Sequence, residues 1–139
     1  MTRLTGLCWV TLLVAISRFI LCSEPRSFHR YVVGSPTLGY GEKALFKLES
    51  AYAEAHQELP ARLFLGIGDQ EEQAPFSALG HRGVIVTVSD FYRFAAILQE
   101  RGYDGLQFTK RVFKGFDHTD VPGAIFAAGL RYVFQETPA

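Results

Sequence analysis

Residues 62–68, with the sequence RLFLGIG, most narrow what this chain can fold into. After its first residue the run contains only apolar side chains and glycines, with no alternation of apolar and polar positions. Strands with one face in water alternate in this way, whereas strands buried on both faces of a parallel sheet are apolar throughout. The run therefore predicts a central parallel strand, and such a strand needs helices on both faces of its sheet.

Helical segments alternate with this strand and with two further apolar runs. The expected strands are residues 31–33, 62–68 and 106–113, and the expected helices are residues 42–59, 89–101 and 123–134. Pro60 ends the first helical segment, Gly102 follows the second, and Pro122 suits the first turn of the third. Glu49 lies among the charged residues expected on the solvated faces of the first helix. This alternation predicts an α/β fold, a partial doubly wound parallel sheet.

The sequence divides into two expected regions, residues 1–27 and residues 28–139, which differ in their apolar content. Residues 4–16 are almost continuously apolar, and Arg18 interrupts the run that follows. A buried core helix fits this segment, and so does a signal peptide, because the start is basic, although no small-x-small cleavage site follows. A membrane span needs about 20 apolar residues, and Arg18 falls inside any such window. We expect a cytoplasmic protein, or a secreted one if residues 4–22 are a signal peptide.

Composition limits the classes of partner. Fourteen basic and 14 acidic residues cancel, so no basic excess is available to neutralise phosphates, and nucleic acid is not expected as a partner. Cys8 and Cys22 both lie in the N-terminal region and cannot form a disulfide framework for the rest.

Residues 66–68 (GIG) lack the third glycine of a dinucleotide loop, because Glu71 stands there. The histidines show no metal-ligand spacing. We therefore expect no cofactor and no metal.

Titratable side chains follow two of the expected strands at their carboxyl ends, where open parallel sheets gather functional groups. They are Asp69, Glu71 and Glu72 after the second strand, and Asp117, His118 and Asp120 after the third. A carboxylate facing an imidazole is the orienting pair of a nucleophilic triad, because it fixes the tautomer and stabilises the imidazolium. A surface loop histidine beside two aspartates also fits the spacing around His118, and this alternative stays open here.

The segment 28–38 (FHRYVVGSPTL) resembles the stretch after the nucleophile helix in the esterase-D-like α/β hydrolases, which include the siderophore (enterochelin-type) esterases. Residues 44–72 (ALFKLESAYAEAHQELPARLFLGIGDQEE) are similar to the next helix and strand of that family, and residues 89–118 to its last helix, strand and histidine loop. The resemblance covers about residues 28–134. It implies the C-terminal half of an α/β-hydrolase fold that cleaves a small-molecule carboxylic ester through a serine nucleophile. It also implies His118 as general base and Glu71 as the acid, with Asp69 as the alternative acid.

Two departures from the family pattern limit this implication. Gly39 and Tyr40 stand where the family has a pair of tryptophans lining the substrate pocket. The G-x-S-x-G elbow is missing as well. Residues 6–10 (GLCWV) keep its spacing with Cys8 in place of serine, but Val10 replaces the second glycine that the sharp turn needs. No nucleophile is therefore identifiable.

Three interpretations follow from the sequence. On the first, the chain is a truncated or frame-disrupted copy of an esterase, which holds a base and an acid without a nucleophile and is inactive. Residues 12–21 are then the remnant of the nucleophile helix. On the second, the chain is a non-catalytic exported or membrane-tethered α/β module that uses residues 4–22 as its address. On the third, two copies associate through an open edge of the sheet.

Overall fold

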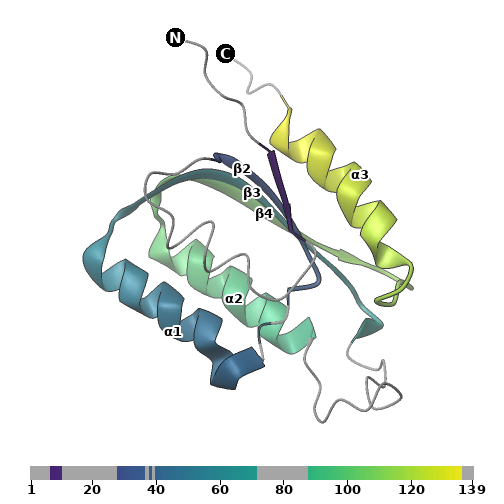
Figure 1. Ribbon diagram of the computed structural model, residues 1–139, viewed down its shortest axis with the longest axis horizontal. Helices are drawn as coiled ribbons and strands as arrows, with labels where there is room; N and C mark the ends of the chain where they lie inside the picture. The colour runs from purple at the N-terminus through teal and green to yellow at the C-terminus, as the bar shows by residue number, and fades with distance from the viewer. Residues whose placement is uncertain (1–6, 11–27, 37, 39, 72–87, 136–139) are drawn as a thin grey trace.

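The computed structural model describes residues 7–10, 28–36, 38, 40–71 and 88–135. The elements are β1 (Leu7–Val10), β2 (Arg30–Gly34), α1 (Tyr40–Ala55), β3 (Glu58–Gly68), α2 (Val88–Arg101), β4 (Asp104–Phe113) and α3 (Val121–Val133). The strands form one four-stranded sheet in the order β1-β2-β3-β4, and every neighbouring pair is parallel (Figure 1). The predicted α/β class with a parallel sheet is confirmed.

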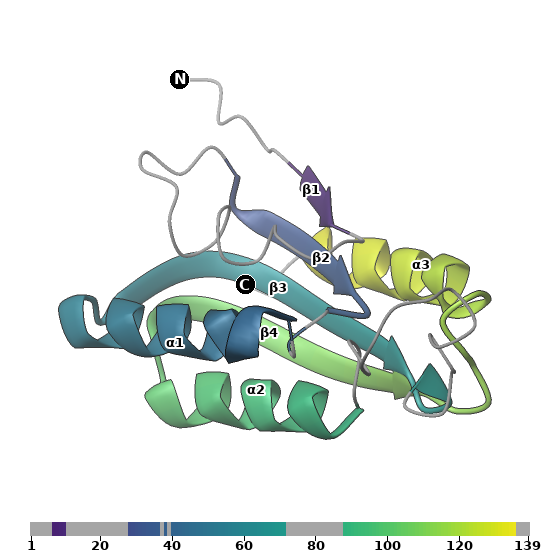
Figure 2. The ribbon, with the colours of Figure 1, turned by 60° about the horizontal axis from the view of Figure 1, so that its bottom comes forward.

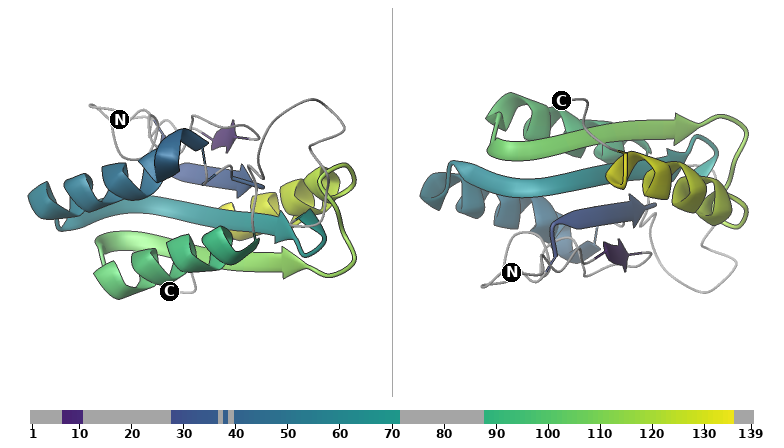
Figure 3. Two further views of the ribbon diagram at one scale, coloured as in Figure 1. Left: turned by 90° about the horizontal axis from the view of Figure 1, so that it is seen from below. Right: turned by 90° about the horizontal axis from the view of Figure 1, so that it is seen from above.

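Helices cover the sheet on both faces. Figure 2 shows α1 and α2 together on one side of it and α3 on the other, and the two opposite views of Figure 3 agree. Successive residues of β3 enter the two cores in turn, since Leu63 and Leu65 pack with α1 and α2, whereas Phe64 packs with Ile125 of α3. From Leu63 to Gly68 both faces of β3 are buried, and the side chains on both faces are apolar.

Glycines let α3 lie close against β2 and β3. A Cβ atom at Gly66 would lie 2.8 Å from Cγ1 of Ile125, and one at Gly129 would lie 2.3 Å from Cγ1 of Val32. Neither distance leaves room for a methyl group, so any larger residue would push the helix away from the sheet. The two glycines thus set the height of α3 above the sheet, and with it the position of the loop that enters α3.

Residues Leu7–Val10 form a strand, so the core-helix interpretation of the apolar N-terminal segment is wrong for these four residues. The strand pairs in parallel with β2, with Cys8 opposite Tyr31 and Val10 opposite Val33. A short apolar run fits a buried helix and a buried strand equally well, and here the open edge of β2 decides between them. Residues 1–6 and 11–27, on which the signal-peptide and nucleophile-helix interpretations depend, lie outside the described residues.

The boundary between α1 and β3 also differs from the prediction. The helix ends at Ala55, and Pro60, expected to end the helical segment, lies inside β3. The strand tolerates this proline because its register with β4 shifts between Glu58 and Ala61, so the proline falls at an irregularity of the ladder. The neighbouring strand β4 accommodates the proline ring with Gly105, at which φ is 80° and a Cβ would lie 3.1 Å from Cα of Pro60.

The second and third helices agree with the sequence. The helix α2 ends at Arg101, and Gly102 follows it with a φ of 58°, the left-handed conformation expected after a helix. The helix α3 carries Pro122 in its first turn. In the part of the chain that the structure describes, no helix has the length and apolar character that a bilayer crossing requires.

Candidate functional site

The carboxyl ends of β2, β3 and β4 lie along one edge of the sheet, as the arrowheads in Figure 3 show. Their register keeps them level, because Gly34 pairs with Gly66 and Gly68 pairs with Phe113. The loops that leave these ends are therefore neighbours, although they are far apart in the sequence. They bring together residues that follow each of the three strands.

The imidazole of His118 contacts the carboxylate of Glu71, with 2.7 Å between Nδ1 and Oε1. Glu71 follows β3 and its side chain is fully buried, whereas the side chain of His118, after β4, remains 33% exposed. The structure thus places together the two residues that the family resemblance singled out. Because the contact occupies Nδ1, proton exchange with a bound molecule would fall to Nε2.

The second oxygen of the same carboxylate accepts two hydrogen bonds. The Ser35 hydroxyl donates to Oε2 over 2.8 Å, and the Gly68 backbone N–H donates to it over 2.7 Å. A buried carboxylate is costly unless its oxygens are satisfied, and these donors hold Glu71 with Oε1 turned to His118. Glu71 is therefore fixed from the ends of two strands.

Ser35 belongs to the site, although sequence reasoning did not single it out. Among the described residues it is the one non-glycine with a positive φ, at 46°, and its backbone N–H donates to the carbonyl of Gly66 over 2.8 Å. This unusual conformation directs a buried hydroxyl at the carboxylate. The sequence signal was the Gly34-Ser35-Pro36 turn directly after an apolar strand, in which a serine can bond locally instead of continuing the strand.

The alternative acid has a different role in this structure. Asp69 accepts a hydrogen bond from the backbone N–H of Gly115 over 2.8 Å, and its own N–H donates to the carbonyl of Phe113 over 3.0 Å. These bonds join the loop after β3 to the loop after β4. Asp69 thus fastens the loop that carries His118, and Glu71 is the carboxylate in contact with the imidazole. Glu72 lies outside the described residues.

The loop that carries His118 is fastened by its own polar groups as well. The Asp117 carboxylate accepts hydrogen bonds from the Thr119 backbone N–H over 2.8 Å and from the Thr119 hydroxyl over 2.6 Å, and these bonds lower the pKa of Asp117. Asp120 returns a bond, since its side chain accepts from the N–H of Asp117 over 2.8 Å. The loop also lies directly on β3, where a Cβ at Gly68 would come within 2.3 Å of the Phe116 carbonyl oxygen.

The hydrogen bond to Glu71 raises the pKa of His118 above its ordinary value of 6.5, and partial burial opposes this rise. The charges of Glu71 and Asp117 raise it further. An imidazolium held by a buried carboxylate is the state that a general base reaches when it takes a proton. The pair is therefore suited to accept a proton at His118.

Folding stability is expected to depend on pH through this pair. Because the pKa of His118 is higher in the folded chain than in the unfolded chain, its stabilising effect is fully present below 6.5 and is lost as the pH rises through the folded value. Urea unfolding between about pH 5 and pH 9 should show this loss, and His118→Gln should diminish it. The matched control His56→Gln changes an exposed histidine just after α1 and should keep the loss. An unchanged pH profile in His118→Gln would contradict the assignment.

Among the described residues, no nucleophilic side chain considered in the sequence analysis lies at this edge of the sheet. Cys8, which stands for serine in the GLCWV pattern, lies inside β1 opposite Tyr31 and not at a turn after a strand. Gly39 is outside the described residues, and Tyr40 begins α1. Among the residues that the structure describes, no three His, Cys, Asp or Glu side chains are grouped to hold a metal ion.

No protein-family model matches the sequence, and no curated protein matches it. Solved structures match the fold. An IroE-like serine hydrolase from Shewanella oneidensis has a TM-score of 0.68 and 19% identity, with 93% of this chain and 40% of that chain covered. Siderophore hydrolase EstB from Aspergillus nidulans has 0.62 and 15%, covering 95% and 50%. The BES protein from Bacillus cereus has 0.60 and 19%, covering 84% and 40%.

This chain thus spans half or less of the length of the proteins whose fold it shares. At these identities the likeness establishes the fold. The chain therefore has the fold of the C-terminal half of a siderophore-esterase-like α/β hydrolase.

Proposed function

We propose that this chain carries the base and the acid of a serine-type carboxylic-ester hydrolase, with His118 as general base and Glu71 as its carboxylate. The observation that carries the proposal is the 2.7 Å contact between His118 Nδ1 and the buried Glu71 Oε1, at the carboxyl edge of a parallel sheet. The names of two structural neighbours, a serine hydrolase and a siderophore hydrolase, support hydrolysis as the reaction.

In the complete centre, a serine hydroxyl attacks the ester carbonyl and His118 takes its proton at Nε2. Glu71 stabilises the imidazolium that forms, and His118 then returns the proton to the leaving alcohol. Water, activated by the same imidazole, releases the acyl group from the serine. Ser35 and Gly68 act through Glu71 in this scheme, because they hold its second oxygen.

The sequence contains no G-x-S-x-G motif. We therefore propose that the 139-residue chain does not hydrolyse esters by itself. We expect the purified chain to release nitrophenolate from a short-chain nitrophenyl ester no faster than His118→Ala does. Release that is lost in His118→Ala and kept in His56→Ala would contradict the inactive half of the proposal. Release well above that of the ester in buffer alone, if neither variant changes it, would contradict the assignment of His118 as the base.

A test of the catalytic half of the proposal needs a serine nucleophile positioned beside His118. A chimera provides one, in which residues 28–135 replace the segment that they match in the IroE-like serine hydrolase. We expect it to hydrolyse the nitrophenyl ester and to lose this activity in His118→Ala. A chimera that unfolds cooperatively on heating, and so is folded, but has no His118-dependent activity would contradict the proposal.

A further inference from the structure

The strand β4 has an open edge. It pairs with β3 on one side, and in the described part of the chain no strand pairs with its other side (Figure 1). The strand is 10 residues long and contains no proline, and most of its residues are exposed or half-buried. A long open edge presents unpaired backbone N–H and C=O groups to any strand that can lie beside it.

The side chains along β4 form a pattern that is complementary to itself in the reverse direction. Asp104 is exposed at the start of the strand, Leu106 and Phe108 follow at alternate positions, and Lys110 comes next. If a second β4 lies antiparallel about a two-fold axis through Gln107, Asp104 of each copy is opposite Lys110 of the other. Leu106 is then opposite Phe108. Each copy therefore meets an opposite charge and an apolar side chain.

Two registers shifted toward the C-terminal end of β4 are less favourable. A two-fold axis through Lys110 places the two Lys110 side chains opposite each other, and an axis just beyond it places Lys110 opposite Arg111. Like charges directly opposite each other destabilise a strand pair. The axis through Gln107 avoids both contacts.

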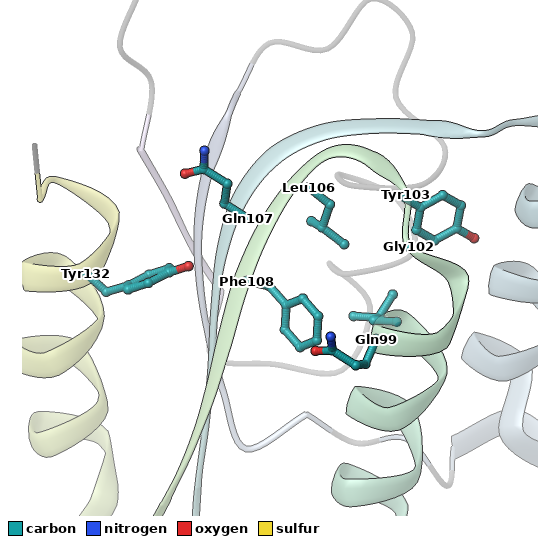
Figure 4. A pocket seen from close by; sticks show the side chains of 8 residues that line it. Gln99, Gly102, Tyr103, Leu106, Gln107, Phe108 and Tyr132 are labelled. Atoms are coloured by element: carbon teal, nitrogen blue, oxygen red, sulfur yellow. The ribbon is translucent and has the colours of Figure 1, made fainter. Parts of the chain in front are cut away.

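A groove of about 270 Å³ lies against the first half of β4, where the register about Gln107 would place the partner strand. Leu98 and Gln99 of α2 line it together with Leu106 and Phe108 of β4. In Figure 4 the side chains of Phe108 and Gln99 lie together on the α2 side of the strand, whereas Tyr132 of α3 lies on its opposite side. The groove thus reaches both faces of β4 and its apolar lining includes the residues that the antiparallel register pairs.

We propose that a second copy of this chain docks on β4, antiparallel and in register about Gln107, so that two four-stranded sheets join into one. The two His118–Glu71 pairs then lie toward opposite ends of the β4 ladder, because the strands run in opposite directions. This interface does not depend on the proposed hydrolase chemistry.

Sedimentation of the chain over a range of concentrations tests the proposal through a charge exchange. Asp104→Lys and Lys110→Asp should each raise the dimer dissociation constant about tenfold or more, because each creates two like-charge pairs per dimer. The double variant Asp104→Lys/Lys110→Asp should restore the value of the unmodified chain. Glu54→Lys, an exposed change on α1, should leave it unchanged.

A monomer at every concentration would overturn the proposal. So would a dimer that neither single variant weakens, or single variants that the exchange does not restore. Amide hydrogen exchange on the unmodified chain provides a second test that needs no variant. Amides of β4 should become more protected as the concentration rises, and protection that is independent of concentration would also overturn the proposal.

Discussion

In the chimera that carries residues 28–135, Glu71→Gln is expected to lower kcat for a short-chain nitrophenyl ester by about 10⁴-fold, as the equivalent amide change does in a Ser-His-Asp triad. The amide keeps the shape of the side chain but removes the charge that stabilises the imidazolium, and it favours the wrong tautomer of His118. KM should change little, because Glu71 does not face the bound ester in this scheme. Steady-state rates at several ester concentrations separate the two constants.

The alternative acid supplies the matched control for this variant. Asp69→Asn removes the other carboxylate of the loop after β3, whose contact is with the Gly115 backbone N–H and not with the imidazole. We expect its kcat to stay within about tenfold of that of the parent chimera, since the charge beside His118 is kept. A loss in Asp69→Asn as large as that in Glu71→Gln would contradict the assignment of the acid.

A large effect on stability is expected at Phe94. Its side chain is 2% exposed, and its ring meets Phe46 of α1 edge to face with 5.7 Å between centroids. Phe94→Ala would leave a cavity where α1 and α2 meet over the sheet and should lower the free energy of unfolding by about 3–5 kcal/mol. Urea denaturation of the 139-residue chain measures this change.

Tyr92 serves as the matched control for Phe94, because it is an aromatic residue of the same helix that is 47% exposed. Its truncation to alanine removes less buried surface and should cost about 1 kcal/mol or less. Equal losses in Tyr92→Ala and Phe94→Ala would show that α2 does not pack on the sheet through the face described.

Local sequence patterns were sufficient to predict the strands and helices whose pattern is distinctive. The apolar run 62–68 predicted a strand buried on both faces, and the capping glycine and proline predicted α2 and α3. The strand β1 could not be predicted in this way, because an apolar run as short as Leu7–Val10 has no distinctive period and its pairing with β2 is a tertiary effect.

Glu49 shows the same limit for single residues. The sequence places it among the charged residues of an amphipathic helix, yet the structure leaves it 1% exposed. Its carboxylate accepts hydrogen bonds from Arg101 Nε over 3.0 Å and from the Tyr103 hydroxyl over 2.7 Å. Burial, and then the bond to Glu49, raises the pKa of Tyr103. Partners more than fifty positions away along the chain made burial possible, and no local pattern contains them.

The candidate site was predictable in part for a related reason. The rule that side chains gather at the carboxyl ends of parallel strands predicted that the loops after β3 and β4 lie together, and the family resemblance singled out His118 and Glu71 within them, which the structure places in contact. Spacing alone could not decide between Glu71 and Asp69, which are two positions apart. The choice depends on the direction in which the chain leaves β3 and on the donors that meet it there, Ser35 and Gly68.

The position of α3 has a consequence for synthesis on the ribosome. This helix alone, among the described elements, covers the face of the sheet formed by Val32 and Phe64, and it is the last of them in the chain. While the chain is being made, β2, β3 and β4 emerge first, and no other described element covers that face before α3 has left the exit tunnel. The core formed by Val32, Phe64 and Ile125 therefore cannot be completed before α3 emerges, and until then these strands present an apolar surface that chaperones can bind.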